Sequence, residues 1–361
     1  MLKLLALDRF TILLIVMVIL ATIVPVSGLA ANIFSVITSG AIAILFFLHG
    51  AKISREALVD GVMHWKFHLV VFAFTFALFP ALGLMAKPVL LPILGQELYW
   101  GFLFMCFLPS TVQSSIAFTS VAKGNVASAV CSASFSNLIG MFITPILVSF
   151  FILGQSQQGF DPTSSIIKIT LLLLVPFVLG QLLRPYVYPH MLKTPHLVKF
   201  FDQSTILMVV YGAFSGAVVA GLWTIVSWQT LLILTLVCSI FLTLIMLLAF
   251  YIPKWLGFNK ADQIAMFFCS SKKTLASGVP MAQILFIGQP LGLIVLPIMI
   301  FHQIQLMVCG VIANYWSKHP VSELQEYFAS LYFLPYNHAH LLCLALTVSV
   351  SVGQKNGLLW C

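Results

Sequence analysis

Charge is what this sequence has least of. Of its 361 residues, only 7% are charged and nine are acidic. A soluble globular domain carries about 25% charged residues. A chain that is 61% hydrophobic, with a mean hydropathy of +1.09, is therefore excluded from that class. The composition predicts an all-α polytopic membrane protein.

The sequence also lacks the motifs of common enzymes. It contains no paired carboxylates, no Ser/His/Asp set, no glycine-rich phosphate loop and no HExxH, and its acidic residues fall in loops or at the ends of apolar runs. The seven cysteines form no CxxC and mostly lie within apolar runs, where cysteine acts as a small hydrophobe. The net charge of +8 comes from short loops rather than from a basic stripe. We therefore expect no enzyme activity, no nucleic-acid partner, and no cofactor other than sodium as a coupling ion.

Hydropathy and loop residues predict ten membrane-spanning helices. Each apolar run approaches or exceeds the roughly 20 residues that a helix needs to cross a bilayer, and prolines inside them are tolerated in membrane helices. The predicted spans 1 to 10 are residues 10–28, 32–50, 67–86, 98–122, 125–153, 164–183, 200–222, 229–252, 262–287 and 290–313.

The basic residues predict the orientation. Lysine and arginine gather in loops on the cytoplasmic side of membrane proteins. One side has only Lys87 and Lys168, so both termini are expected to face the cytoplasm. The other side has Lys3, Arg9, Lys52, Arg55, Lys66, Lys123, Arg184, Lys193, Lys199, Lys254, Lys260 and Lys318.

The two halves of the chain match in span order. An offset of 163 residues places Thr111 over Thr274 and Ser114 over Ser277, although small polar residues can also match by chance. Because each half would hold an odd number of spans, the second half would be inverted, as in alternating-access transporters. The predicted parts are a first repeat at 1–153, a second repeat at 154–316 and a cytoplasmic tail of unclear role at 317–361.

Span 9 is interrupted by two adjacent lysines. A charge near the middle of a membrane is costly and usually faces a cavity or a partner rather than lipid. Three roles stay open: a cation held by the carbonyls of a helix C-terminus, a proton carrier, and a group that binds an anionic solute. The candidate site residues of this span are Ser271, Lys272, Lys273, Thr274 and Ser277.

Span 4 is interrupted by proline. Pro109 removes a backbone donor and frees a carbonyl in the preceding turn, which protein, water or an ion must satisfy in a membrane. Hydroxyls beside such a carbonyl suit a hard cation or a solute carboxylate; a proline kink with Ser and Thr packed on a neighbouring helix is the alternative. The candidates are Pro109, Ser110, Thr111, Gln113, Ser114 and Ser115.

Spans 5 and 10 extend the candidate site. Ser128 and Ser132 share one face of span 5, either as a packing seam or as hydroxyls beside the interrupted helix. His302 and Gln303 lie in span 10, and His302 shares a face with Gln305. Helix–helix hydrogen bonds and the lining of a cavity are both open interpretations for these residues.

A family resemblance rests on three strings: LPSTVQSSIAFTSVAKGNVASAVCSAS, DQIAMFFCSSKKTLASGVPMA and LPIMIFHQIQLMV. They resemble the bile acid:sodium symporter superfamily over about residues 5–316, closest to the branch of the seventh member of solute carrier family 10 and its bacterial relatives. The resemblance implies two inverted five-helix repeats. It also implies a panel of spans 1, 2, 6 and 7, and a core of spans 3–5 and 8–10 in which spans 4 and 9 cross.

The resemblance also implies a sodium site. Sodium-coupled members use a Ser-Asn pair on span 4, hydroxyls on span 5 and a Glu with a Gln on span 9. Here Ser270 to Lys273 stand in the region of the acid, which weighs against sodium coupling. The implied sodium ligands are Ser114, Ser115, Ser128 and Ser132, although an ungapped alignment places Ala129 and Ala133 at the last two positions.

Together these features predict a secondary active transporter, a symporter-like protein of the plasma (inner) membrane that moves a small organic anion by alternating access. Its expected partners are the lipid bilayer and that solute. The alternative, from another class, is a membrane regulatory protein that kept the transporter fold without solute flux.

Overall fold

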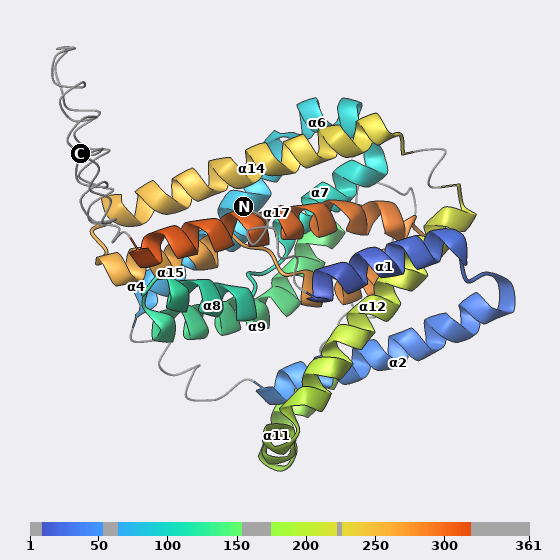
Figure 1. The fold of residues 1–361 in the computed structure, drawn as a ribbon, viewed down its shortest axis with the longest axis horizontal. Coiled ribbons are helices and arrows are strands. Elements are labelled where there is room, and N and C mark those ends of the chain that lie inside the picture. The colour runs from blue at the N-terminus through green and yellow to red at the C-terminus, as the bar shows by residue number, and fades with distance from the viewer. Residues whose placement is uncertain (1–8, 53–63, 154–174, 222–225, 319–361) are drawn as a thin grey trace, which may run out of the picture. The chain divides into compact units, whose positions relative to one another are not determined.

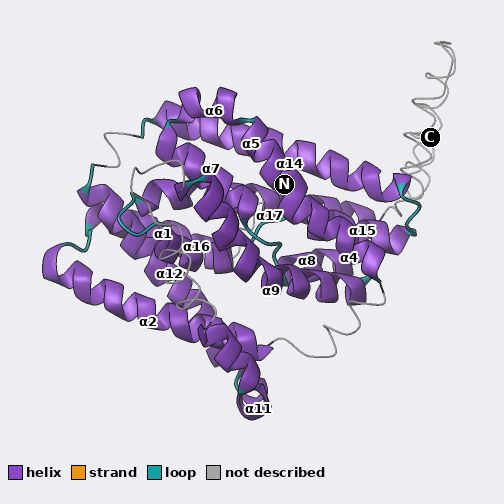
Figure 2. Ribbon diagram, turned by 180° about the vertical axis from the view of Figure 1, so that it is seen from behind, coloured by secondary structure: helices purple, strands orange, loops and turns teal. Residues whose placement is uncertain are grey.

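The computed structural model describes residues 9–52, 64–153, 175–221 and 226–318, and each element bounded in these ranges is a helix (Figures 1 and 2). Nearly all of the predicted tail and most of predicted span 6 lie outside these ranges. Large apolar side chains remain exposed along the helices, as expected where the surrounding solvent is lipid. The protein is an all-helical, multi-pass membrane protein.

Among the described residues, six helical segments are long and apolar enough to cross a membrane. They coincide with predicted spans 2, 3, 5, 7, 8 and 10 to within five residues at every boundary. The segments are α2 (Gly28–Lys52), α4–η2–α5 (Trp65–Met85), α9 (Val126–Phe151), α12 (Pro195–Val219), α14 (Trp228–Trp255) and α17 (Leu291–Lys318).

The other predicted spans differ in length or continuity. α1 (Arg9–Ile23) ends earlier than predicted, because Pro25 follows it and cannot donate the backbone hydrogen bond of a helix. Residues 175–182 of predicted span 6 are helical. Two short helices that the sequence did not predict are α6 (Lys87–Leu94) and α11 (Arg184–Lys193).

Predicted spans 4 and 9 are each divided in two. α7 (Gln96–Phe107) and α8 (Gln113–Val121) are separated by residues 108–112, which we call the first break. Leu108, before the proline, is extended with φ −71° and ψ 152°, the conformation that a following proline favours. α15 (Lys260–Ser270) and α16 (Leu275–Leu285) are separated by residues 271–274, the second break. Both interruptions were predicted from the sequence.

The helices contact one another in two sets. α1, α2, α11 and α12 form one set, which Figure 1 shows beside the other helices. α4, η2 (Phe74–Leu78), α5 (Phe79–Met85), α6, α7, α8, α9, α14 and α15 form the other. α16 contacts α12 of the first set. Within the first set, Lys52 of α2 pairs with Asp202 of α12.

Glycine allows α2 and residues 175–182 to approach closely. A Cβ atom added to Gly180 would lie 1.9 Å from the Phe47 carbonyl oxygen, and one added to Gly50 would lie 2.1 Å from the Phe177 carbonyl oxygen. The contact is reciprocal, because each segment presents Phe-x-x-Gly to the other. Small residues commonly permit such contacts between membrane helices.

We expect Gly180→Ala to lower the free energy of unfolding by about 1–3 kcal/mol, because the added methyl group must displace backbone. Thermal unfolding of the purified protein in detergent measures the loss. Gly216→Ala on α12 is the matched control, since a Cβ there meets no atom within 4 Å. Equal losses in the two variants would contradict the close contact.

Candidate functional site

The two breaks lie against each other. The backbone N–H of Thr274 donates to the Pro109 carbonyl oxygen at 3.0 Å, and the Ser110 hydroxyl donates to the Cys269 carbonyl oxygen at 2.6 Å. Polar groups in one break that have no partner within a regular helix are therefore hydrogen-bonded by the other break or by the helix end next to it. This mutual pairing meets the requirement that non-helical backbone within a membrane protein be satisfied internally.

In each break, one residue has both its backbone N–H and its backbone carbonyl hydrogen-bonded to side chains of the long helix that follows. The Ser110 N–H donates to Ser136 Oγ at 3.2 Å, and Asn137 Nδ2 donates to the Ser110 carbonyl at 2.6 Å. The Lys273 N–H donates to Gln305 Oε1 at 3.0 Å, and Gln305 Nε2 donates to the Lys273 carbonyl at 2.9 Å. Ser110 and Lys273 are separated by the 163-residue offset noted in the sequence.

The hydroxyls after each break follow the same offset. Thr111 Oγ1 lies 2.8 Å from Ser114 Oγ and 3.2 Å from Ser115 Oγ. The Ser277 hydroxyl donates to Thr274 Oγ1 at 3.3 Å, and Thr274 caps the start of α16. In both places a threonine that precedes the second half-helix contacts the serine three residues later.

Lys273 is completely buried within the second break. Its ammonium donates to the carbonyl oxygens of Thr75 at 2.9 Å, Cys106 at 2.9 Å and Leu108 at 2.7 Å. It also lies 4.0 Å from the centroid of the Phe79 ring, within the range of a cation–π interaction. An ammonium has three N–H donors, and all three are used here.

Lys272 is equally buried but has different surroundings. Within the described part of the chain, its ammonium donates one hydrogen bond, to the Ser114 carbonyl oxygen at 2.8 Å. The ammonium lies 4.0 Å from the centroid of the Phe118 ring and 5.2 Å from that of Phe268. Donor capacity therefore remains on Lys272. Ser114 is only half-buried and Gln113 is exposed, so this side of the first break is the more open.

The serines of α9 are buried, with Ser128 6% and Ser132 3% exposed. Among the hydrogen bonds of the described residues, none joins their hydroxyls to Ser114 or Ser115. Ala129 lies in an apolar cluster with Ala265 and Cys269 of α15. The sodium site that the resemblance implies therefore stays a prediction.

The polar residues of α17 reach the second break through Gln305, which is fully buried. His302 Nδ1 lies 2.8 Å from Gln305 Nε2 and 3.4 Å from the Lys273 carbonyl oxygen. Gln303, the other candidate on this helix, is partly buried. Thr75 and Asn137 belong to the same network and were missed from the sequence. Pro80 was visible in the sequence, but in a regular α-helix it would free the carbonyl of residue 76 and not that of Thr75.

The sequence profile of the SBF-like CPA transporter family matches residues 8–318. The chain belongs to this family. The resemblance carried by the three strings is thereby confirmed, and the family is one of transporters.

Relatives occur in bacteria and in animals. A protein of Pseudomonas aeruginosa that carries no functional name, PA2026, is 51% identical over 311 residues, which cover 86% of this chain and 93% of the relative. YfeH of Escherichia coli strain K12, whose name assigns it a symporter activity by inference, is 48% identical over 322 residues, 88% of this chain and 95% of the relative. Sodium/bile acid cotransporter 7 of Rattus norvegicus is 30% identical over 275 residues, 75% of this chain and 80% of the relative.

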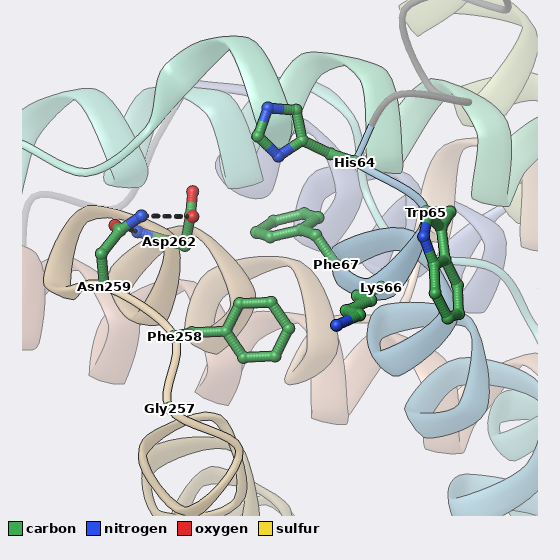
Figure 3. Close-up of a pocket in the computed structure, with 8 residues that line it drawn as sticks. All are labelled: His64, Trp65, Lys66, Phe67, Gly257, Phe258, Asn259 and Asp262. Atoms are coloured by element: carbon green, nitrogen blue, oxygen red, sulfur yellow. Dashed lines mark hydrogen bonds between the residues drawn. The ribbon is translucent and has the colours of Figure 1, made fainter.

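This SBF-like CPA transporter also has a pocket of about 390 Å³, lined by residues 64–67, 257–259 and Asp262. Figure 3 shows Asn259 and Asp262 at one end of the pocket and Trp65 at the other. Eight residues of α15, or about 12 Å of helix, separate Asp262 from the start of the second break. The pocket is thus distinct from the lysines.

Asp262 is a buried carboxylate, 5% exposed, with uncharged partners. Its oxygens accept from Asn125 Nδ2 at 2.7 Å and Asn259 Nδ2 at 2.6 Å. The side chains of Asn125 and Asn259 also cap the N-termini of α9 and α15, and the positive end of the α15 dipole favours the carboxylate. Asp262 therefore joins two helix starts, which leaves the lysine pair as the better candidate for solute chemistry.

Proposed function

We propose that this protein is a secondary active transporter of a small organic anion and that the solute binds where the two breaks meet. The observation that carries this proposal is the buried lysine pair between two interrupted helices. Two cations held away from lipid mark a functional site in a membrane protein. Lysine, as a cation with N–H donors and no acceptor, favours an anionic solute.

We propose further that the chain forms ten spans in two inverted repeats. The support is local: Ser110 and Lys273, as well as Thr111 and Thr274, occupy matching positions in two networks of hydrogen bonds. Spans 1, 2, 6 and 7 would form the panel, and the set of α1, α2, α11 and α12 is in keeping with it. Alternating access would then be a movement of the core, spans 3–5 and 8–10, against this panel.

The proposed orientation has both termini in the cytoplasm, within the plasma (inner) membrane. The support is the excess of lysine and arginine in loops on one side of the spans. Lys52, Lys66 and Lys254 lie at helix ends assigned to that side.

The two lysines have different proposed roles. The three donors of Lys273 are engaged by carbonyls, so binding a solute would break existing hydrogen bonds. Lys272 donates to one carbonyl of the described residues and otherwise faces aromatic rings. A carboxylate or sulfonate could replace part of the aromatic contact and form charge-assisted hydrogen bonds, which are stronger than neutral ones. Lys272, together with Ser114 and Gln113, is therefore the proposed anion-binding group.

We expect at least one small organic anion to raise the melting temperature of the purified protein, because a ligand that binds only the folded state stabilises it. The probes are taurocholate, sulfate esters, and mono- and dicarboxylates. Taurocholate is included because related proteins are named sodium/bile acid cotransporters. The stabilising anion should then enter proteoliposomes when a sodium, potassium or pH gradient is imposed separately.

A neutral analogue of each stabilising anion, such as its methyl ester, serves as the matched control and should stabilise less. Stabilisation without uptake under any of the three gradients would contradict transport. If no solute either stabilises the protein or enters the vesicles, the result would favour a regulatory protein without flux.

A further inference from the structure

Lys273 occupies a shell of backbone oxygens. The carbonyl oxygens of Thr75, Cys106 and Leu108 lie 2.7–2.9 Å from its ammonium nitrogen, and the Phe79 ring covers another side. Rings of backbone carbonyls are also how channel filters replace the hydration shell of a monovalent cation. The shell therefore has the chemistry of a monovalent-cation site, with an ammonium in the place of the ion.

The Thr75 carbonyl has no backbone donor within its own helix because of the local backbone geometry. Thr75 lies in the π-helical segment η2, where the Phe79 N–H donates to the Phe74 carbonyl. In this i→i+5 pattern, the donor for the Thr75 carbonyl would be residue 80. That residue is Pro80, which has no N–H. The oxygen is therefore left for a partner from outside the helix.

The other two carbonyls belong to the end of α7. The Cys106 carbonyl would accept from Ser110 in a continuous helix, but the Ser110 N–H donates to Ser136 Oγ instead. The Leu108 carbonyl lies beyond the last helical residue, Phe107. The C-terminus of a helix carries partial negative charge, which favours a cation there. Proline and chain geometry thus create this shell independently of the lysine that fills it.

We infer that Lys273 is a covalently attached cation that occupies a monovalent-cation site in place of a bound ion. Each of its three N–H groups donates to one of the three carbonyl oxygens, so none of these three oxygens is left to bind sodium. One consequence rests on the proposed transport function: the transport cycle uses this fixed charge and needs no sodium at this site.

The experiment measures the melting temperature of purified wild-type protein and Lys273→Ala in sodium chloride and in an equal concentration of choline chloride. Lys273→Ala removes the ammonium and most of the side chain, which leaves three carbonyl oxygens and space for a cation. We expect sodium to raise its melting temperature by about 3 °C relative to choline. Propylammonium, which restores the missing atoms, should act in the same direction. The wild-type protein should show no difference between sodium and choline.

Two variants serve as controls. Lys273→Met fills the space with an uncharged chain, so it should melt below wild type and show no response to sodium. Lys272→Ala removes a lysine that, among the described residues, has one carbonyl partner and two aromatic neighbours. It should also show no response. A response to sodium in either control would overturn the assignment of the shell to Lys273.

The inference is also overturned if folded Lys273→Ala responds to neither sodium nor propylammonium. If that variant does not fold, Lys273→Met decides: a melting temperature equal to that of wild type overturns the inference, because a resident cation bound by three carbonyl oxygens must stabilise the fold, and a lower one supports it. No solute is used, so a failure of the uptake experiments would leave this test intact. Transport by wild type, together with a folded Lys273→Ala that responds to neither cation, would refute the resident cation and keep the proposed function.

Discussion

Lys272→Gln should reduce uptake of the stabilising anion by at least about 30-fold, while the protein still folds. Removing one partner of a buried charge pair costs about 2–5 kcal/mol of binding, and each 1.4 kcal/mol is a factor of ten. Glutamine keeps hydrogen-bonding capacity near the Ser114 carbonyl, which the Lys272 ammonium contacts at 2.8 Å, but it carries no charge. The initial rate of uptake into proteoliposomes and the anion-dependent shift in melting temperature should fall together.

The matched control is Lys254→Gln, because Lys254 is exposed in the last turn of α14, a helix that contains neither break. It should transport at the wild-type rate. Lys272→Arg keeps the charge and should keep more uptake than Lys272→Gln. Wild-type uptake by Lys272→Gln would refute the proposed anion-binding role of this lysine, and a loss in Lys254→Gln would show a non-specific effect of surface charge.

Gln305→Leu should lower the free energy of unfolding by about 3 kcal/mol. The Gln305 amide accepts from the Lys273 N–H at 3.0 Å and donates to the Lys273 carbonyl at 2.9 Å. Leucine would leave both backbone groups buried without these partners, and each unsatisfied group costs about 1–3 kcal/mol. The melting temperature in detergent, or unfolding in denaturant, measures the loss.

Gln113→Leu is the control for the same change of side chain, since Gln113 is exposed at the start of α8. A surface substitution of this kind changes stability by about 0.5 kcal/mol or less. If Gln305→Leu were as stable as Gln113→Leu, the second break would not depend on the side chain of α17.

The sequence predicted the spans that hydropathy can detect. Burial in lipid selects apolar residues along a whole helix, so α2, α9 and α14 are visible as local runs. The first break could also be predicted from neighbouring residues, because Pro109 disrupts a helix whatever surrounds it. The break at Lys272 and Lys273 was visible because charge is rare within an apolar span.

Other features could not be read along the chain. The close approach of Gly50 to Phe177 and of Gly180 to Phe47 depends on which helices pack together. A glycine within an apolar run has no distinctive local pattern. Asp202 pairs with Lys52, which lies 150 residues away in the chain. Thr75 appeared as an ordinary residue of an apolar span, although its carbonyl is one of the three around Lys273.

The sequence by itself determined that this is a multi-pass membrane protein of a transporter family, with interrupted helices that carry polar residues. Hydropathy, proline and rare charges act over a few neighbouring residues, so they can be read in order. Only the tertiary structure decided that the two lysines differ. The carbonyl partners of Lys273 lie 165, 167 and 198 residues from it in the chain, and the partner of Lys272 lies 158 residues away. Folding brings these carbonyls together, which leaves the Lys273 ammonium with all three donors used and the Lys272 ammonium with one carbonyl partner among the described residues.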